Sequence, residues 1–349
     1  MGLSAFPIAR TPFILGCPES LPPTEQALAA TGTTARRILA ALNALPHPCS
    51  LQHYLDTLRV LMTQLPDASA GEMINDPRES LENRENDVAF GIERHQGDCA
   101  ILLIAATLNA VHQAGELIAR NGTSLAHAEW NTMISTAHAI LRLIATPRAI
   151  PETHLPLQPA PSKMEDDAQD PLRRWVRGHL LFMVQCQGMS LSTQLLINAA
   201  HSEDIELACA QAHQLIHLMN ISRITLEFAT DLNQQQYLSQ IRPTLMPPLA
   251  PPKMSGINWR DHVVMIRLMR QSTPAWHFVE QAEPELAARM RSVLAEVYTA
   301  HRAVCEKFVG EENTSLLAKE NATTSAGQVL EGLKNSRLKL LKTKNFYDA

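Results

Sequence analysis

The segment His301-Arg302-Ala303-Val304-Cys305 carries an imidazole and a thiol four residues apart. On a helix this spacing places both side chains on one face, one turn apart. Such a pair suits a haem group, because the imidazole can bind iron while the thiol forms a thioether with a vinyl group at the porphyrin edge. The arrangement differs from the two-cysteine CxxCH sequence of covalent haem sites. Taken alone, the segment is explained more simply as a buried core histidine beside an inert cysteine.

Other combinations of reactive residues are weaker. His213 and His217 have the spacing of metal ligands on a helix, but no third ligand stands at a matching distance. A cluster at 173–179 could form an anion-binding site, although a solvated helix face is the simpler interpretation; it contains Arg173, Arg174, Trp175, Arg177 and His179. The sequence also lacks the paired ExxH segments of di-iron bundles, nucleotide-binding glycine loops and the GxSxG elbow.

The composition is that of a folded protein, with 349 residues, 45% apolar and 19% charged. A net charge of −5 and the absence of a long basic run before the last dozen residues argue against nucleic-acid or anionic-membrane partners. No apolar stretch reaches 18 residues, and the first residues lack the features of a secretion signal. We therefore expect a cytoplasmic protein, whose six scattered cysteines are free thiols.

The elements that must position the His–Cys pair are predicted to be helices. Glycine is scarce, at 14 residues, and aromatic residues make up 5%, which argues against an all-β chain. Helical periodicity between capping residues predicts helices at 51–65, 98–121, 124–146, 171–186, 202–232, from 259 onwards, at 284–309 as the longest, and near the C-terminus. Proline-rich loops are expected at 147–169 and 243–258. The predicted fold class is all-α, with 1–349 as a single helical domain and the functional residues in 259–337.

The residues that follow Cys305 favour a haem site over a core histidine beside an inert cysteine. The helix continues through Glu306 to Gly310, and a polar loop then ends Asn321-Ala322-Thr323-Thr324-Ser325-Ala326-Gly327. This order resembles the tryptophan dioxygenase superfamily, in which a helical histidine precedes a glutamate, a glycine and a substrate loop. The loop here is longer, and Thr323 and Thr324 stand where the dioxygenases have glycines. With Cys305 and the upstream His262, the sequence resembles one branch, the haem-dependent 3-methyltyrosine hydroxylases of the saframycin and safracin pathways.

This resemblance implies a set of site residues. His262 and His301 would both bind the iron of a b-type haem, and Cys305 would hold the porphyrin through one thioether. Thr323, Thr324 and Ser325 would bind the amino-acid end of the substrate. The implied reaction converts 3-methyl-L-tyrosine to 3-hydroxy-5-methyl-L-tyrosine with hydrogen peroxide, in tetrahydroisoquinoline antibiotic biosynthesis.

Two axial histidines leave iron without an open position, so one must leave before peroxide binds. His301 is one turn from the covalent anchor, whereas His262 follows a proline-rich loop, so we expect His262 to leave and then act as general base and acid. Arg260, Arg267 and Arg270 lie near enough in sequence to neutralise haem propionates or a substrate carboxylate.

Two other functions remain open on the sequence alone. One is a non-catalytic helical protein that binds haem for storage or sensing, and the other is an indole-ring dioxygenase of the same superfamily. Permanent six-coordination would favour the first, and ring opening would identify the second. A homodimer is the assembly considered.

Overall fold

The computed structural model describes residues 11–67, 70–77, 79–151, 155, 157–159, 170–247, 250, 256–309 and 325–341. The all-α prediction is confirmed, since the only strands in these ranges form one short parallel pair. In chain order the elements are β1 (Phe13–Leu15), η1 (Pro18–Ser20), α1 (Glu25–Asn43), α2 (Leu51–Thr63), α3 (Leu81–Phe90), β2 (Ile92–Arg94), α4 (Cys99–Asn121), α5 (His127–Ile134), α6 (Thr136–Ala145), α7 (Pro171–His201), α8 (Ile205–Ala229), α9 (Gln234–Gln236), η4 (Tyr237–Ile241), η5 (Arg242–Leu245), η6 (Gly256–Asn258), α10 (Arg260–Gln271), α11 (Thr273–Ala282), α12 (Pro284–Val309) and α13 (Ala326–Leu340).

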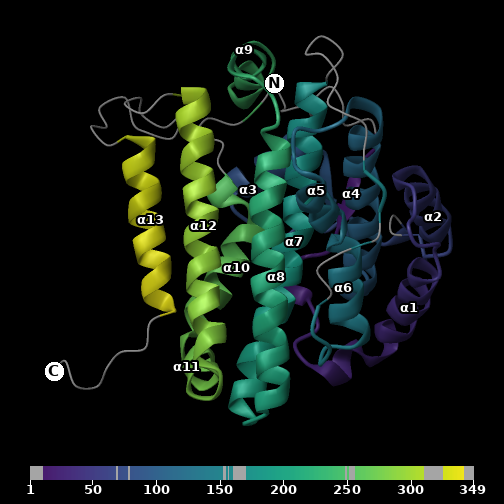
Figure 1. Cartoon of the computed structure of the whole chain (residues 1–349), viewed down its shortest axis with the longest axis vertical. Coiled ribbons are helices and arrows are strands. Elements are labelled where there is room, and N and C mark those ends of the chain that lie inside the picture. Colours follow the sequence, from purple (N-terminus) through teal and green to yellow (C-terminus); the bar gives the residue numbers. More distant parts are fainter. Residues whose placement is uncertain are drawn as a thin grey trace.

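The long helices stand side by side in a bundle with α7 at its centre (Figure 1). α7 packs against α8, α4 and α10, while α12 packs against α8 and α13. One hydrophobic cluster extends through the bundle from Phe13 to Leu341. α4 and α7 are apolar and long enough to cross a membrane, but 72% and 89% of their apolar windows are buried by other helices, as in core helices.

Local capping signals explain where several helices begin. The side chains of Ser50, Asp98 and Asp170 each accept a backbone N–H in the first turn of α2, α4 and α7. Trp259 takes the N-cap position of α10 and Gly122 follows the end of α4. The predicted starts of these helices are therefore confirmed.

Two helix predictions are wrong. The single helix expected at 124–146 is broken at Ser135 into α5 and α6, and Ser124 binds Asp231 instead of capping a helix. α7, expected to end at Cys186, continues to His201 and with 31 residues is longer than the 26-residue α12. Gly188 does not end it, because a β-carbon there would lie 2.2 Å from Ile140, so the glycine permits close packing of α6 on α7.

The described residues of the first proline-rich segment pack against the protein more closely than a surface loop. Leu155 and Leu157 are buried, and Asn131 hydrogen-bonds to the backbone of Leu155 through its amide oxygen and nitrogen. Leu157 also forms a bridge with Cys49. These contacts fix the described part of the segment against α5.

Candidate active site

His301 and Cys305 lie one turn apart on α12, as the spacing predicted. The His301 side chain is exposed, yet the surrounding protein desolvates the ring and lowers its pKa. The ring is therefore neutral near pH 7, which is the form that binds a metal. The half-buried Cys305 has a raised pKa because burial disfavours the thiolate.

His262 lies in the first turn of α10 and follows directly after a buried ion cluster. Asp261 is fully buried and accepts hydrogen bonds from Arg94 Nη2 at 2.6 Å and from Gln187 Nε2 at 2.8 Å. Arg94 also binds Asp87 at 2.8 Å through Nε. Because α3, β2, α7 and α10 all contribute to this cluster, the start of α10 is held in one place.

A row of three ring side chains on α7 connects these segments. Trp175, His179 and Phe182 follow at intervals of four and three residues and so share one face of the helix. The Phe182 ring lies 6.3 Å from the His262 ring, centroid to centroid. His179 is close enough to His301 for the charge of His301 to affect its pKa. The α7 row therefore contacts His262 and lies within electrostatic range of His301.

Tyr237 in η4 lies near both Cys305 and the same face of α7. Burial raises the pKa of Tyr237, and Cys305 is close enough to contribute to this shift. The Tyr237 ring stacks on Phe308 at 4.5 Å and lies 6.0 Å from the Trp175 ring. His262, His301 and Cys305, far apart in sequence, are thus arranged around one stretch of α7.

The sequence suggested His179 only as part of a possible anion-binding cluster and did not predict its position in this site. The His179 Nδ1 atom lies 2.7 Å from the carbonyl oxygen of Trp175, and the His179 ring packs 4.4 Å from the Trp175 ring and 5.5 Å from the Trp259 ring. Burial lowers the pKa of His179 to about 4; the hydrogen bond to Trp175 opposes this shift and His301 adds to it. The available signal was the 175–179–182 spacing, because rings at that interval form one helix face.

The described residues fit a haem group. Iron favours neutral imidazoles as ligands, and desolvation by the surrounding protein lowers the pKa of His301 and so favours its neutral form. The indole nitrogens of Trp175 and Trp259 are buried without a hydrogen-bond partner among the described residues. Buried donors without partners cost free energy, so a bound group with acceptor atoms would stabilise this region.

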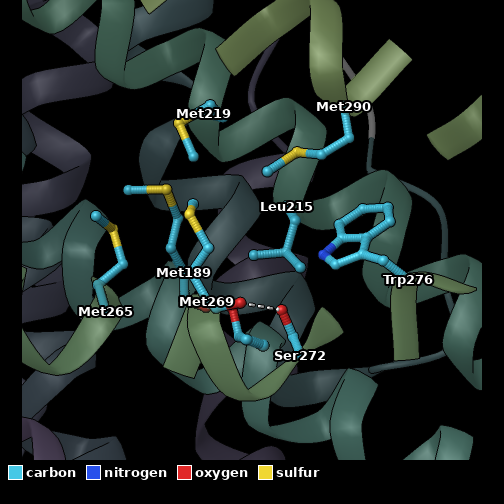
Figure 2. A pocket seen from close by; sticks show the side chains of 9 residues that line it. Met189, Leu215, Met219, Met265, Met269, Ser272, Trp276 and Met290 are labelled. Carbon is cyan, nitrogen blue, oxygen red and sulfur yellow. Dashed lines mark hydrogen bonds between the residues drawn. The ribbon is translucent and has the colours of Figure 1, made fainter. Parts of the chain in front are cut away.

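A small methionine-rich pocket lies further along the same helices (Figure 2). Met265 and Met269 are three and seven residues after His262, which places them on the same face of α10. The cavity measures about 10 Å³, enough for one water-sized molecule. Its lining consists of Met189, Thr193, Leu215, Met219, Met265, Met269, Ser272, Trp276 and Met290. The methionine side chains of this pocket are flexible and apolar, so they can adapt to a small change in shape.

The structure places the remaining predicted residues as follows. Thr323 and Thr324 lie outside the described residues, and Ser325 is the N-cap of α13, where its hydroxyl accepts the Gln328 N–H. Arg260 is not available for a propionate as expected. Its guanidinium is already bound by carboxylates on segments far away in sequence, namely Glu19, Asp76 and Glu79.

The arginines of the 173–179 cluster form neither an anion site nor a wholly solvated face. Arg174 is buried in an ion pair with Asp231, and Arg177 donates to the carbonyl oxygen of Gln113. Arg267 and Arg270 on α10 are exposed. His217 is buried on α8, and the described residues contain no cluster of histidine, cysteine or acidic side chains that would hold a metal ion.

Comparisons with known proteins identify the family of this chain. Residues 14–292 match the family described as SfmD 3-methyl-L-tyrosine peroxygenase. The chain is 40% identical over 337 residues to the 3-methyl-L-tyrosine peroxygenase of Streptomyces lavendulae, which covers 96% of this chain and 92% of that protein. It is also similar to the crystal structure of reduced SfmD obtained by soaking with sodium hydrosulfite, with a TM-score of 0.76 and 39% identity over 83% of this chain and 96% of that one. The chain therefore belongs to the SfmD 3-methyl-L-tyrosine peroxygenase family.

Proposed function

We propose that this protein is a haem-dependent peroxygenase that hydroxylates 3-methyl-L-tyrosine to 3-hydroxy-5-methyl-L-tyrosine. Family membership supports an oxidoreductase that acts on a tyrosine derivative with peroxide. The observation that carries the haem assignment is the convergence of His262, His301 and Cys305 on one stretch of α7. By the resemblance noted from the sequence, the proposal extends to a role in tetrahydroisoquinoline antibiotic biosynthesis. The cytoplasmic location expected from the composition and a homodimer as the assembly complete the proposal.

Three residues would hold the cofactor in this proposal. His262 and His301 would bind the iron, and the Cys305 thiol would hold the porphyrin through a single thioether. Haem, when bound, supplies the iron at which hydrogen peroxide is activated for oxygen transfer. The buried cluster around Asp261 fixes the first turn of α10, so movement of His262 would be confined to its side chain.

The protein residues transfer protons and position the substrate. His262 takes the proton from one peroxide oxygen at an imidazole nitrogen and returns it to the other, which leaves as water. One peroxide oxygen enters the ring ortho to the phenol hydroxyl, and the displaced ring hydrogen becomes the proton of the new hydroxyl group. The aromatic walls formed by Phe182 and Trp259 exclude water, and Thr323, Thr324 and Ser325 hold the amino and carboxylate groups.

An absorption spectrum of the purified protein, recorded with and without 3-methyl-L-tyrosine, tests the ligand assignment. Two axial imidazoles give a six-coordinate, low-spin ferric spectrum, and a high-spin, water-ligated spectrum at neutral pH would contradict it. His262→Ala is expected to give a five-coordinate or water-bound spectrum, whereas His301→Ala loses most of the haem.

Product analysis separates the three functions that the sequence left open. Incubation with peroxide and 3-methyl-L-tyrosine should give a catechol sixteen mass units heavier than the substrate. Absence of product together with unchanging six-coordination would indicate a haem carrier. An opened indole ring from tryptophan would indicate a dioxygenase.

A further inference from the structure

The Nε2 atom of His179 is a hydrogen-bond acceptor in the site that has no assigned role. The carbonyl oxygen of Trp175 can only accept a hydrogen bond, so His179 Nδ1, 2.7 Å away, must carry the hydrogen. Nε2 therefore keeps its lone pair, and none of the described residues forms a hydrogen bond with it. The surrounding rings of Phe90, Trp175 and Trp259, at 4.4 to 5.5 Å between centroids, fix the orientation of the imidazole.

The chemistry of Nε2 limits what can bind there. Apart from a metal ion, a nitrogen lone pair binds only a hydrogen-bond donor, which excludes the carboxylate groups of the porphyrin and the substrate. The substrate has two kinds of donor, its ammonium group and its phenolic hydroxyl. The same burial that disfavours a charge on His179 also disfavours an ammonium ion, and no carboxylate of the described residues affects the His179 pKa.

A phenolic hydroxyl meets the remaining requirement. It is neutral, it donates one hydrogen bond and it accepts others. The indole N–H groups of Trp175 and Trp259, whose rings flank His179, are buried donors that lack a partner among the described residues. A hydroxyl bound at Nε2 could accept a hydrogen bond from one of these N–H groups. It would then give a partner both to Nε2 and to that indole.

We propose that Nε2 of His179 accepts a hydrogen bond from the ring hydroxyl of the substrate. The inference rests on the proposed function, because it takes a tyrosine as the substrate. Since His179 is close to His301, the hydroxyl is held beside the proposed iron site, and the ring carbon next to it is the one presented for oxygen transfer. His179 would thereby select tyrosines over phenylalanines and fix the ortho position of attack.

The test compares two ligands that differ only in this hydroxyl, 3-methyl-L-tyrosine and 3-methyl-L-phenylalanine, by isothermal titration of the haem-loaded, full-length protein. A site built to hydrogen-bond a hydroxyl strongly rejects the analogue that lacks it. We expect the tyrosine to bind the wild type at least about tenfold more tightly. In His179→Phe the ratio should fall to about one, and in His179→Gln, which keeps an acceptor, part of it should return.

A general loss of stability weakens the binding of both ligands, so it leaves the ratio of the two affinities unchanged. The variant His217→Phe provides a matched control. His217 is also buried and also has a pKa lowered to about 4 by burial, but it lies on α8. This variant should keep the wild-type ratio.

An unchanged ratio in His179→Phe overturns the inference while leaving the proposed function intact. So does loss of the low-spin spectrum in that variant before any ligand is added, since His179 would then be an iron ligand. Failure of the wild type to bind 3-methyl-L-tyrosine overturns the proposed function, and the inference with it.

Discussion

Asp261→Asn should weaken both the fold and the position of His262. Asp261 is fully buried and accepts from Arg94 Nη1 at 3.0 Å, from Arg94 Nη2 at 2.6 Å and from Gln187 Nε2 at 2.8 Å. An asparagine turns one of these acceptor positions into an NH₂ group that faces other donors, and it removes half of the negative charge around Arg94. Breaking a buried ion pair costs about 3–5 kcal/mol. Because Asp87 still binds Arg94, we expect the lower end, about 3 kcal/mol.

Equilibrium unfolding in guanidinium chloride measures this loss, and Asp231→Asn is its matched control. Asp231 is also buried and paired with an arginine, Arg174, but it binds the 123–124 segment rather than α10. Both variants should lose stability, whereas only Asp261→Asn should reduce the low-spin fraction of the haem spectrum. A loss below about 1 kcal/mol, the range of an exposed ion pair, or equal spectral changes in both variants, would refute the reasoning.

Three further predictions concern the cofactor, the substrate loop and pH. Cys305→Ala should still bind haem but release it in acidic organic solvent, while the intact mass of denatured wild type should include the haem. Thr323→Ala and Thr324→Ala should raise the substrate concentration needed for half-maximal rate, because each lost contact to a charged group costs about 1–3 kcal/mol of binding free energy. The haem spectrum should stay unchanged. Unaltered substrate dependence in both variants would place the binding loop elsewhere. Burial lowers the pKa of His179 and of His217 from 6.5 to about 4, so the unfolded state binds more protons as the pH falls from 6.5 to 4 and stability decreases. At pH 5 each histidine should cost about 2 kcal/mol in unfolding free energy relative to pH 7, and His217→Phe should remove its share; equal stability at both pH values would show that these rings are not buried in neutral form.

The sequence predicted those features that depend on neighbouring residues. Ser50 and Asp98 cap their helices through side-chain bonds within three residues, and the spacing of His301 and Cys305 needs only a helix. The length of α7 was missed because Gly188 has the same local appearance as a helix end. Only the position of Ile140, on a different helix, shows why glycine is needed there.

The missed parts of the site depend on contacts between distant segments. Arg260 looked available because Glu19, Asp76 and Glu79, which bind it, are 181 to 241 residues away. His179 looked like part of a charged surface because its partners Phe90 and Trp259 come from α3 and the start of α10. His262 was found only through a family resemblance, since nothing in its local sequence indicates Phe182 as a neighbour.

The cluster around Asp261 also bears on how the protein matures. Gln187 donates to the carbonyl oxygen of Gly16, 171 residues away, and Arg94 binds Asp261 across 167 residues. Contacts at such separations form slowly because long loops must close first. His262 therefore reaches its place only after early and late segments of the chain have docked. In the proposed enzyme, coordination of the iron by His262 would then form last, so the low-spin fraction of the haem spectrum would record how many molecules had completed folding.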